Sequence, residues 1–358
     1  MFRTQSRSIL SRFFAGLTCL TLLSAPASAQ GVSPFEHGWT LDEEASELHF
    51  MSIKKGDLAE DSSFATLSGL ITEDGKAQVR VLVDSVDTLV DLRNVRMRFL
   101  FFESFKYPEA LITAEIPPAA LDDLAQVRRK MIPLEFTLSL HGVTVTRSAD
   151  VAVTLISNDR VNVSTTKPIA LKLSDFNLTE GWQKLQEAAN VIIVPVGMVS
   201  FDFVFNRSAP GTPSLLTPVA ATRTGAAAAL ETKGEFDREA CIGRFEILSR
   251  AGNIYFSAGS AKLSADSYPL LENLFDVVSR CPGLRIEIAG HTDSDGGETA
   301  NLRLSELRAG SVKTYLEDKG IPASRMLVVG YGEAKPLLDN TTAANKARNR
   351  RIEFSALN

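Results

Sequence analysis

Two aspartates and an arginine lie within 16 residues of one another and could together bind a charged molecule. Asp293 and Asp295 belong to the loop-type segment GHTDSDGG, and Arg308 follows in a predicted helix. Arginine can hold a carboxylate through two parallel hydrogen bonds, and aspartate can accept hydrogen bonds from an ammonium group. An amino acid with both charged ends exposed would satisfy both residues. An internal Asp293–Arg308 salt bridge that only fixes the loop is the alternative, and spacing alone favours it.

A strand and a helix must position these residues. Alternation in Leu284–Ala289 predicts a strand, and the segment Leu302–Lys319 has the period of a helix. The helical period places Arg308 in the middle of an otherwise mainly apolar stripe. The members of this predicted stripe are Leu304, Leu307, Ser311, Val312, Tyr315 and Leu316. Because a buried unpaired charge is costly, an arginine there requires an anion or a set of acceptors.

The rest of this region alternates predicted strands with predicted helices. Such alternation predicts an α/β sandwich of βαβαβαβ order on a small sheet. The additional predicted elements are a strand at Asn253–Phe256, a helix at Asp266–Arg280, a strand at Met326–Tyr331, a helix at Thr341–Ala347 and a strand at Arg350–Phe354.

Several motifs of this region occur in the order typical of one known family. They are GHTDSDG, NLRLSELRAGSV, GIPASRMLVVGYGEAKP and NKARNRRIEF. Together they make the segment from Ile254 to Phe354 resemble the OmpA-like C-terminal domain. The resemblance implies non-covalent binding of peptidoglycan through the diaminopimelate of its peptide stem. It implies that Asp293 takes the ammonium group and Arg308 the carboxylate of that residue.

Two further residues match positions of the same family. Asn301 matches the asparagine of its NxxLS motif, and Arg350 matches the first arginine of its NRR motif, so both are expected to support the site. Arg350 also shares a predicted strand face with Ile352 and Phe354, which independently favours an inward arginine. The chain has Asn345-Lys346 where the family usually has Gly-Arg, and lysine lacks the planar fork of arginine.

The segment His37–Asn206 consists of short alternating or β-branched runs separated by turn-type residues. Seven or more such strands predict an all-β sandwich or closed antiparallel barrel. The segment DLRNVRMRFLFFESFKYP predicts a short helix or long loop across one end, and Gly181–Ala189 has helical character. The interior of an eight-stranded barrel can be packed or can hold one elongated apolar ligand. Periodicity does not separate the two, and a packed interior is the default expectation.

This segment also resembles a known family. The motifs WTLDEEASELHF, SGLI, SVDT…R…FFESFKYP and LSLHGVTV are similar to those of the YceI-like family and cover most of Trp39 to Phe205. The resemblance implies an exported lipocalin-like barrel and, since some members bind polyisoprenoid chains, an apolar ligand. A packed barrel acting as a protein–protein interaction module on the cell wall is the alternative.

The first residues indicate export. Residues 1–29 have a basic start, an apolar centre and the cleavage motif Ala27-Ser28-Ala29, which together predict a signal peptide. The apolar run is too short to span a membrane, so the mature protein is not expected to be transmembrane. Its cysteines are Cys241 and Cys281, for which export favours a disulfide over two free thiols.

Domain boundaries follow from composition. We predict a barrel domain at 37–206, a flexible linker rich in Pro, Ala, Thr and Ser at 207–240, and the wall-binding domain at 241–358. The formal net charge of −5 gives no reason to expect a nucleic-acid partner.

The sequence contains none of the catalytic motifs that would indicate an enzyme. Three scattered histidines in the barrel segment lack metal-ligand spacing, and DSDGGE lacks the glutamate that an EF-hand loop requires. No nucleophile motif or P-loop is present, so no enzyme, metal or cofactor is predicted. The sequence predicts a periplasmic protein associated with the cell wall at the inner face of the outer membrane.

Overall fold

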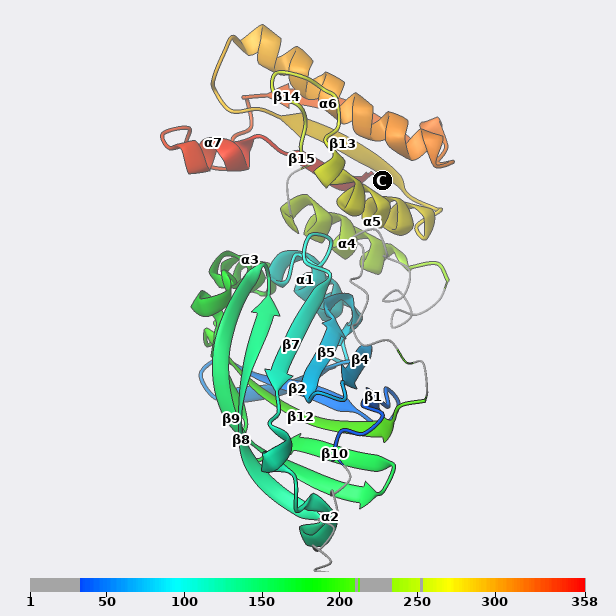
Figure 1. Ribbon diagram of the computed structural model, residues 1–358. Helices are drawn as coiled ribbons and strands as arrows, with labels where there is room; N and C mark the ends of the chain where they lie inside the picture. Colours follow the sequence, from blue (N-terminus) through cyan, green and yellow to red (C-terminus); the bar gives the residue numbers. More distant parts are fainter. Residues whose placement is uncertain (1–32, 210–211, 213–233, 252–253, 358) are drawn as a thin grey trace, which may run out of the picture. The chain divides into compact units, whose positions relative to one another are not determined.

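The computed structural model describes residues 33–209, 212, 234–251 and 254–357. The predicted signal peptide and most of the predicted linker lie outside these residues. The N-terminal domain contains twelve strands within the described part (Figure 1). They are β1 (Trp39–Leu41), β2 (Glu47–Lys54), β3 (Leu58–Phe64), β4 (Leu67–Ile71), β5 (Lys76–Leu82), β6 (Val86–Asp87), β7 (Glu109–Glu115), β8 (Arg129–Leu140), β9 (Val143–Ser157), β10 (Arg160–Thr165), β11 (Ile169–Lys172) and β12 (Val196–Arg207).

Eight of these strands form a closed antiparallel ring. Their order is β1-β4-β5-β7-β8-β9-β10-β12, and β12 pairs back to β1 with Trp39 opposite Arg207. Closure is reinforced by a 2.8 Å hydrogen bond between the hydroxyls of Thr40 and Ser208. A closed ring leaves no unpaired strand edge, so the predicted lipocalin-like barrel is confirmed.

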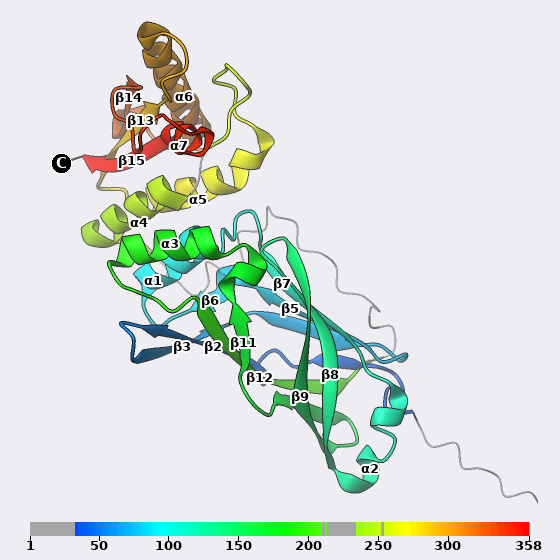
Figure 2. The same ribbon diagram turned by 90° about the vertical axis from the view of Figure 1, so that its left-hand side faces the viewer.

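The other strands extend the barrel wall from β12. The N-terminal half of β12 pairs with β2 and with β11, and β3 and β6 continue the sheet beyond β2. Besides three short 3-10 turns, η1 (Val83–Ser85), η3 (Pro118–Ala120) and η4 (Leu173–Phe176), the helical elements described in this domain are α1 (Asp91–Arg96), the π-helical turn η2 (Met97–Phe101), α2 (Leu124–Val127) and α3 (Thr179–Ala189). The two segments with predicted helical character therefore form α1 with η2, and α3 (Figure 2).

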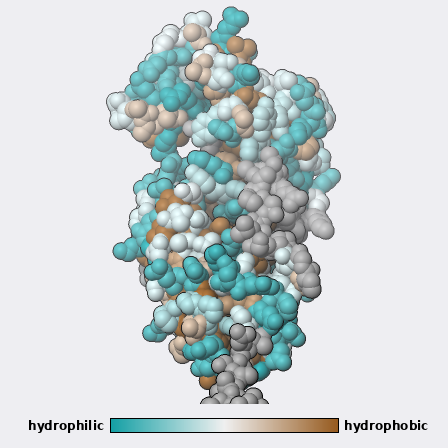
Figure 3. Space-filling view, in the orientation of Figure 1, coloured by the Kyte–Doolittle hydropathy of each residue, from teal (hydrophilic) through white to brown (hydrophobic). Residues whose placement is uncertain are grey.

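Strand alternation determines which barrel residues face inward. On β12 the residues Phe201, Phe203 and Phe205 contribute to the hydrophobic core, while Asp202 between them pairs with Asn162 on β10. On the face shown in Figure 3, hydrophobic side chains are scattered among hydrophilic ones. The apolar surface of the barrel is thus directed mainly inward, as the period of two predicts.

The C-terminal domain is an α/β layer structure. Its elements are α4 (Arg238–Ala251), α5 (Tyr268–Ser279), β13 (Arg285–His291), α6 (Glu298–Asp318), β14 (Met326–Gly332), α7 (Ala343–Asn349) and β15 (Ile352–Leu357). The three-stranded sheet has the order β14-β13-β15, with β13 parallel to β14 and antiparallel to β15. Helix α6 connects β13 to β14 and packs on both, and α4 packs on β15 (Figure 1).

Two predictions about the start of this domain are wrong. The predicted strand Asn253–Phe256 does not join the sheet within the described residues, because Phe256 forms only an isolated bridge with Leu263. The four-strand βαβαβαβ order is thereby reduced to three strands. Helix α4 was not predicted and begins at Arg238, inside the range assigned to the linker. Cys241 and Phe245 of α4 are buried in the domain core.

Helix α6 approaches the sheet through small residues in its first half and through Val312 and Leu316 in its second half. Its buried residues are Asn301, Ser305, Ala309, Val312 and Leu316. A Cβ atom added at Gly290 of β13 would lie 2.0 Å from the carbonyl oxygen of Ser305, so the close contact requires glycine. The predicted apolar stripe is therefore wrong in its orientation: Leu307 is 52% exposed, and Arg308 lies half-buried at the edge of the contact face.

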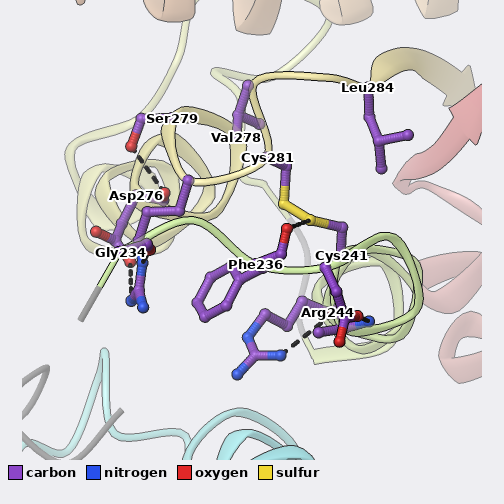
Figure 4. Close-up of a disulfide and its surroundings, with 12 residues drawn as sticks. Gly234, Phe236, Cys241, Arg244, Asp276, Val278, Ser279, Cys281 and Leu284 are labelled. Atoms are coloured by element: carbon purple, nitrogen blue, oxygen red, sulfur yellow. Dashed lines mark hydrogen bonds and ion pairs between the residues drawn. A yellow bond between two sulfur atoms is a disulfide. The ribbon is translucent and has the colours of Figure 1, made fainter. Parts of the chain in front are cut away.

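Cys241 and Cys281, the pair expected to bridge, form a disulfide between α4 and the turn that follows α5 (Figure 4). The ring of Phe236 lies beside the bridge, with the guanidinium carbons of Arg244 and Arg280 each 3.8 Å from its centroid. The bridge closes a loop of 40 residues and ties the entry of the domain to its second helix. No helix in the described residues combines the length and apolar character needed to cross a membrane.

Candidate functional site

The charged residues of the C-terminal domain gather where its parallel strands end. The loop that carries Asp293 and Asp295 leaves the carboxyl end of β13, and Glu333 follows the end of the parallel strand β14. Because carboxyl ends of parallel strands meet at one edge, α6, this loop and the segment after β14 surround a common position. Side chains from these three segments therefore meet there.

Asp293 is paired with Arg350. The carboxylate oxygen Oδ2 of Asp293 accepts a hydrogen bond from Nη1 of Arg350 at 2.5 Å, and Oδ1 accepts one from the backbone NH of Asp295 at 3.1 Å. The Asp293 side chain is 9% exposed and that of Arg350 is 46% exposed. A carboxylate has about four acceptor positions, so each oxygen of Asp293 retains capacity for one further donor.

The predicted strand position of Arg350 is wrong. Arg350 follows the last residue of α7, and β15 begins only at Ile352. The helical turn before the strand, rather than strand alternation, directs Arg350 toward Asp293. Arg350 and Asp293 both act on the pKa of Arg308, which the Arg350 guanidinium lowers and the Asp293 carboxylate raises.

Arg308 is anchored by one nitrogen. Its Nε donates to the carbonyl oxygen of Ser260 at 3.0 Å, and its guanidinium carbon lies 5.1 Å from the ring centroid of Phe256. Among the described residues, neither terminal nitrogen of Arg308 has a hydrogen-bond partner. Burial and the nearby Arg350 guanidinium hold the pKa of Arg308 below its ordinary value, while the carboxylate of Asp293 opposes this shift. An additional anion beside Arg308 would relieve this repulsion.

Asn301 holds the loop rather than presenting a free amide. Its buried Nδ2 donates to the backbone carbonyls of Asp293 at 3.3 Å and Asp295 at 3.1 Å, and to the Glu333 carboxylate at 2.6 Å. These contacts come from the first turn of α6 and fix the path of the chain around Asp293. Asn301 is therefore a positioning residue for the loop.

Lys346 takes part in the same cluster from α7. Its Nζ lies 2.6 Å from Oδ1 of Asp295, and the lysine side chain is 27% exposed. The neighbouring Asn345 donates to the Asp339 carboxylate at 2.7 Å and does not contact the β13 loop in the structure. Lys346, which stands where the family usually has arginine, thus pairs with Asp295 as a single positive charge.

A buried histidine lies directly before the site. His291 is 2% exposed, stacks on Tyr331 with ring centroids 5.3 Å apart, and has its Nε2 3.5 Å from a carboxylate oxygen of Glu353. Interactions with His291 and Arg351 lower the pKa of Glu353 to about 2. Within the described part of the chain, no group of three His, Cys, Asp or Glu side chains has a geometry suited to a metal ion.

The barrel contains a second candidate site, a cavity of about 290 Å³. Its wall is formed almost entirely by apolar side chains from the strands, from η2 and from α3. Representative lining residues are Phe50, Val81, Phe101, Phe136, Trp182 and Phe203. The default expectation of a packed interior is therefore wrong. The lining includes small residues such as Ala110 and Gly197 beside the phenylalanines, and periodicity alone does not show how much space they leave.

Sequence reasoning missed two partners of the C-terminal site. Ser260 lies in the Phe256–Leu263 turn and supplies the carbonyl that holds Arg308. Glu333 comes just after a predicted strand that runs parallel to the strand before Asp293. The position of Glu333 at the carboxyl end of β14 could have identified it from the sequence. The Ser260 contact could not have been predicted, because it uses a backbone carbonyl, which every residue type has.

Comparison with known proteins supports the division into two domains. Residues 39–205 match the family model described as YceI-like domain, and residues 255–350 match the model described as OmpA family. The two domains expected from the sequence motifs are therefore confirmed.

Curated relatives and solved structures add individual similarities. Outer membrane porin F of Pseudomonas fluorescens is 41% identical over 103 residues, covering 29% of this chain and 32% of the porin. Peptidoglycan-binding protein ArfA of Mycobacterium tuberculosis is 36% identical over 103 residues, with the same two coverages. The chain thus spans about a third of the length of these relatives. A polyisoprenoid binding domain from Saccharophagus degradans is 32% identical, covering 48% of this chain and 98% of that domain, with a TM-score of 0.44.

Proposed function

We propose that this protein is an exported, periplasmic, non-catalytic binding protein held on the cell wall at the inner face of the outer membrane. Its C-terminal domain binds peptidoglycan non-covalently through the diaminopimelate of the peptide stem. Its N-terminal barrel binds an apolar, isoprenoid-like ligand. The proposed domains are the barrel at 37–206 and the wall-binding domain, whose folded part begins with α4.

The free fork of Arg308 beside the carboxylate of Asp293 is the observation that carries the wall-binding proposal. The two terminal nitrogens of Arg308 have no partner among the described residues and can take a carboxylate in bidentate fashion. Asp293 retains acceptor capacity for an ammonium group beside its ion pair with Arg350. Asn301 and Arg350 support the site by positioning Asp293. The name of the relative ArfA, a peptidoglycan-binding protein, agrees with this proposal.

The wall-binding proposal is tested by sedimentation with purified peptidoglycan. The mature protein should pellet, whereas Asp293→Ala and Arg308→Ala should remain in the supernatant, since losing one such contact costs about 2–5 kcal/mol. Asp318→Ala and Arg303→Ala, both exposed on α6, are the matched controls and should pellet like wild type. Peptidoglycan that carries lysine in place of diaminopimelate lacks one carboxylate and should bind more weakly.

Two results would count against this assignment. Wild-type protein that stays in the supernatant would contradict wall binding altogether. Folded Asp293→Ala and Arg308→Ala variants that pellet as well as wild type would leave Asp293 and Arg308 with a purely structural role. Circular dichroism of each variant establishes that it is folded.

The cavity of about 290 Å³ carries the barrel proposal. An empty apolar space of this size favours an apolar ligand over a packed interaction module, because a packed interior needs no cavity. Mass spectrometry of an organic extract of the purified protein should find one class of apolar compound, or added prenyl alcohol should bind at one site per chain. Failure of both would favour the protein–protein interaction module instead.

A further inference from the structure

Two tyrosines meet where α5 packs on α6, on the helix face that carries Arg308. Tyr268 is the first residue of α5 and Tyr315 lies in the second half of α6, with their ring centroids 5.9 Å apart. Tyr268 is 44% exposed, and Tyr315 is half-buried. Because Tyr315 follows Arg308 by seven residues, the helical period places both on one face, about 10 Å apart along the axis. An exposed aromatic surface therefore lies two helical turns from the site of Arg308.

A carboxylate and an ammonium group lie beside these rings. Oε1 of Glu272 accepts hydrogen bonds from the Tyr315 hydroxyl at 2.7 Å and from Nζ of Lys319 at 2.6 Å. Oε2 of the partly exposed Glu272 accepts no hydrogen bond from the residues that the structure describes. Burial would raise the pKa of Glu272, but the hydrogen bonds from Lys319 and Tyr315 lower it below its ordinary value. The cluster thus presents an ionised carboxylate with one available oxygen next to an aromatic surface.

This combination of groups suits a carbohydrate. The C–H groups on one face of a pyranose ring are apolar and can pack on an aromatic ring, whereas the hydroxyl and acetamido groups at its rim need acceptors and donors. Tyr268 offers the ring, Oε2 of Glu272 is the acceptor, and Lys319 retains donors beyond its bond to Glu272. The cluster can therefore contact both the face and the rim of one sugar.

We propose that the cluster of Tyr268, Tyr315 and Glu272 is a subsite for the glycan strand of peptidoglycan. It binds the sugar that carries the peptide stem held by Arg308. This inference rests on the proposed wall-binding function and adds a second part of the same polymer to its ligand. Two stem residues and a lactyl group separate diaminopimelate from the sugar, and they span about 10 Å when extended. This span matches the separation of Arg308 and Tyr315 along α6, so one stem can reach both.

Isothermal titration of the mature full-length protein with two matched probes tests the proposal. One probe is the N-acetylated stem tripeptide Ala-γ-Glu-diaminopimelate, in which acetylation removes the terminal charge. The other is the same tripeptide attached to N-acetylglucosaminyl-N-acetylmuramic acid. Wild type should bind the disaccharide tripeptide at least about fivefold more tightly than the tripeptide, because an aromatic contact is added.

Variants assign this preference to the tyrosine cluster. Tyr268→Ala should bring the affinities for the two probes to within about twofold of each other and leave the tripeptide affinity within about twofold of wild type. Leu327→Ala removes a similarly exposed apolar side chain from β14, so it is the matched control and should keep the full preference. Glu272→Ala should also reduce the preference, and it decides the matter if Tyr268→Ala does not fold.

The outcomes separate the glycan subsite from the proposed function. Equal affinity of wild type for the two probes would overturn the subsite and leave stem binding intact, with the tyrosines only joining α5 to α6. The same conclusion follows if folded Tyr268→Ala and Glu272→Ala keep the preference for the disaccharide tripeptide. Binding of neither probe would overturn the wall-binding function and this inference with it.

Discussion

The barrel cavity and the loop that follows β13 are prepared for ligands in opposite ways. The cavity is a space whose wall is formed almost entirely by apolar side chains. The β13 loop is crowded with polar contacts, and Asp293 is already bound to Arg350 before any ligand arrives. A ligand of the cavity gains mainly by burial, whereas a ligand of the loop must fit an existing charge network.

This difference determines where selectivity for a ligand can arise. Burial of apolar area depends weakly on chemical detail, so the cavity should tolerate related chains. Charge-assisted hydrogen bonds depend on direction, so the loop should distinguish diaminopimelate from lysine. If each region binds its own ligand, a change in one of them should leave the other unaffected.

Removal of the disulfide should destabilise only the C-terminal domain. Replacing Cys241 and Cys281 by serine releases a loop of 40 residues, which should lower the free energy of unfolding of that domain by about 4 kcal/mol. Both tryptophans of the protein, Trp39 and Trp182, lie in the barrel, so their fluorescence reports barrel unfolding. Calorimetry should show one transition moved to lower temperature while the fluorescence transition stays in place. A fluorescence transition that moves equally would contradict independent stability.

Loss of the Asn301 amide should lower the affinity for peptidoglycan and leave the stability of the barrel largely unaffected. Asn301→Ala removes two hydrogen bonds to the loop around Asp293 and one to Glu333, and it should reduce peptidoglycan affinity by about 1–3 kcal/mol. Sedimentation titration measures the loss, with Thr314→Ala, exposed on the same helix, as the control. Unchanged affinity in a folded variant would show that the loop keeps its path without Asn301.

Filling the cavity should abolish ligand binding without affecting the wall. Gly197 faces the cavity from β12, and a Cβ atom there would meet no other atom within 4 Å. Gly197→Phe should therefore be tolerated by the fold and should weaken apolar-ligand binding at least about tenfold, since the added ring occupies the space. Fluorescence titration with a prenyl alcohol measures this loss. The same variant should still sediment with peptidoglycan. Loss of both apolar-ligand binding and peptidoglycan binding would contradict the independence of the two regions.

Low pH should lower the stability of the C-terminal domain because Glu353 becomes protonated. Because the pKa of Glu353 is lowered to about 2 in the folded domain, its ionised form stabilises the fold above the ordinary glutamate pKa. This contribution should disappear as pH falls from about 4.5 to about 2. Glu353→Gln should flatten the dependence of the melting temperature on pH in this window, compared with wild type and the exposed control Glu306→Gln. An identical slope in all three would contradict the assignment.

Prediction from sequence succeeded where a residue's partners follow from periodicity or motif order. Strand alternation predicted an all-β sandwich or a closed barrel, the motifs selected the barrel, and motif order identified the C-terminal domain. Among the expected site residues Asp293, Arg308 and Arg350, the first and last form an ion pair. The pairing within that group was not predictable, because it depends on where α7 ends rather than on residue types. The buried face of α6 was misplaced for a related reason: close packing against Gly290 selects serine and alanine, which carry little hydrophobic signal.

The cavity illustrates a different limit of sequence reasoning. Inward phenylalanines are compatible with both a packed and a hollow interior, since the free volume depends on how far apart the strands are held. Ring closure and the extension through β2 and β3 determine that separation. Neither can be derived from the alternation of individual strands.

Ring closure between β1 and β12 has a consequence for biogenesis. Thr40 and Ser208 are 168 positions apart, yet they are bonded side by side in the finished barrel. A chain that emerges N-terminus first therefore holds β1 without its partner until nearly the whole domain has been released. Pairing of such distant segments is slow, and exposed strands are prone to aggregation. We therefore expect the barrel to depend on a holding chaperone during its emergence, while the α/β domain, with its shorter connections, folds quickly on its own.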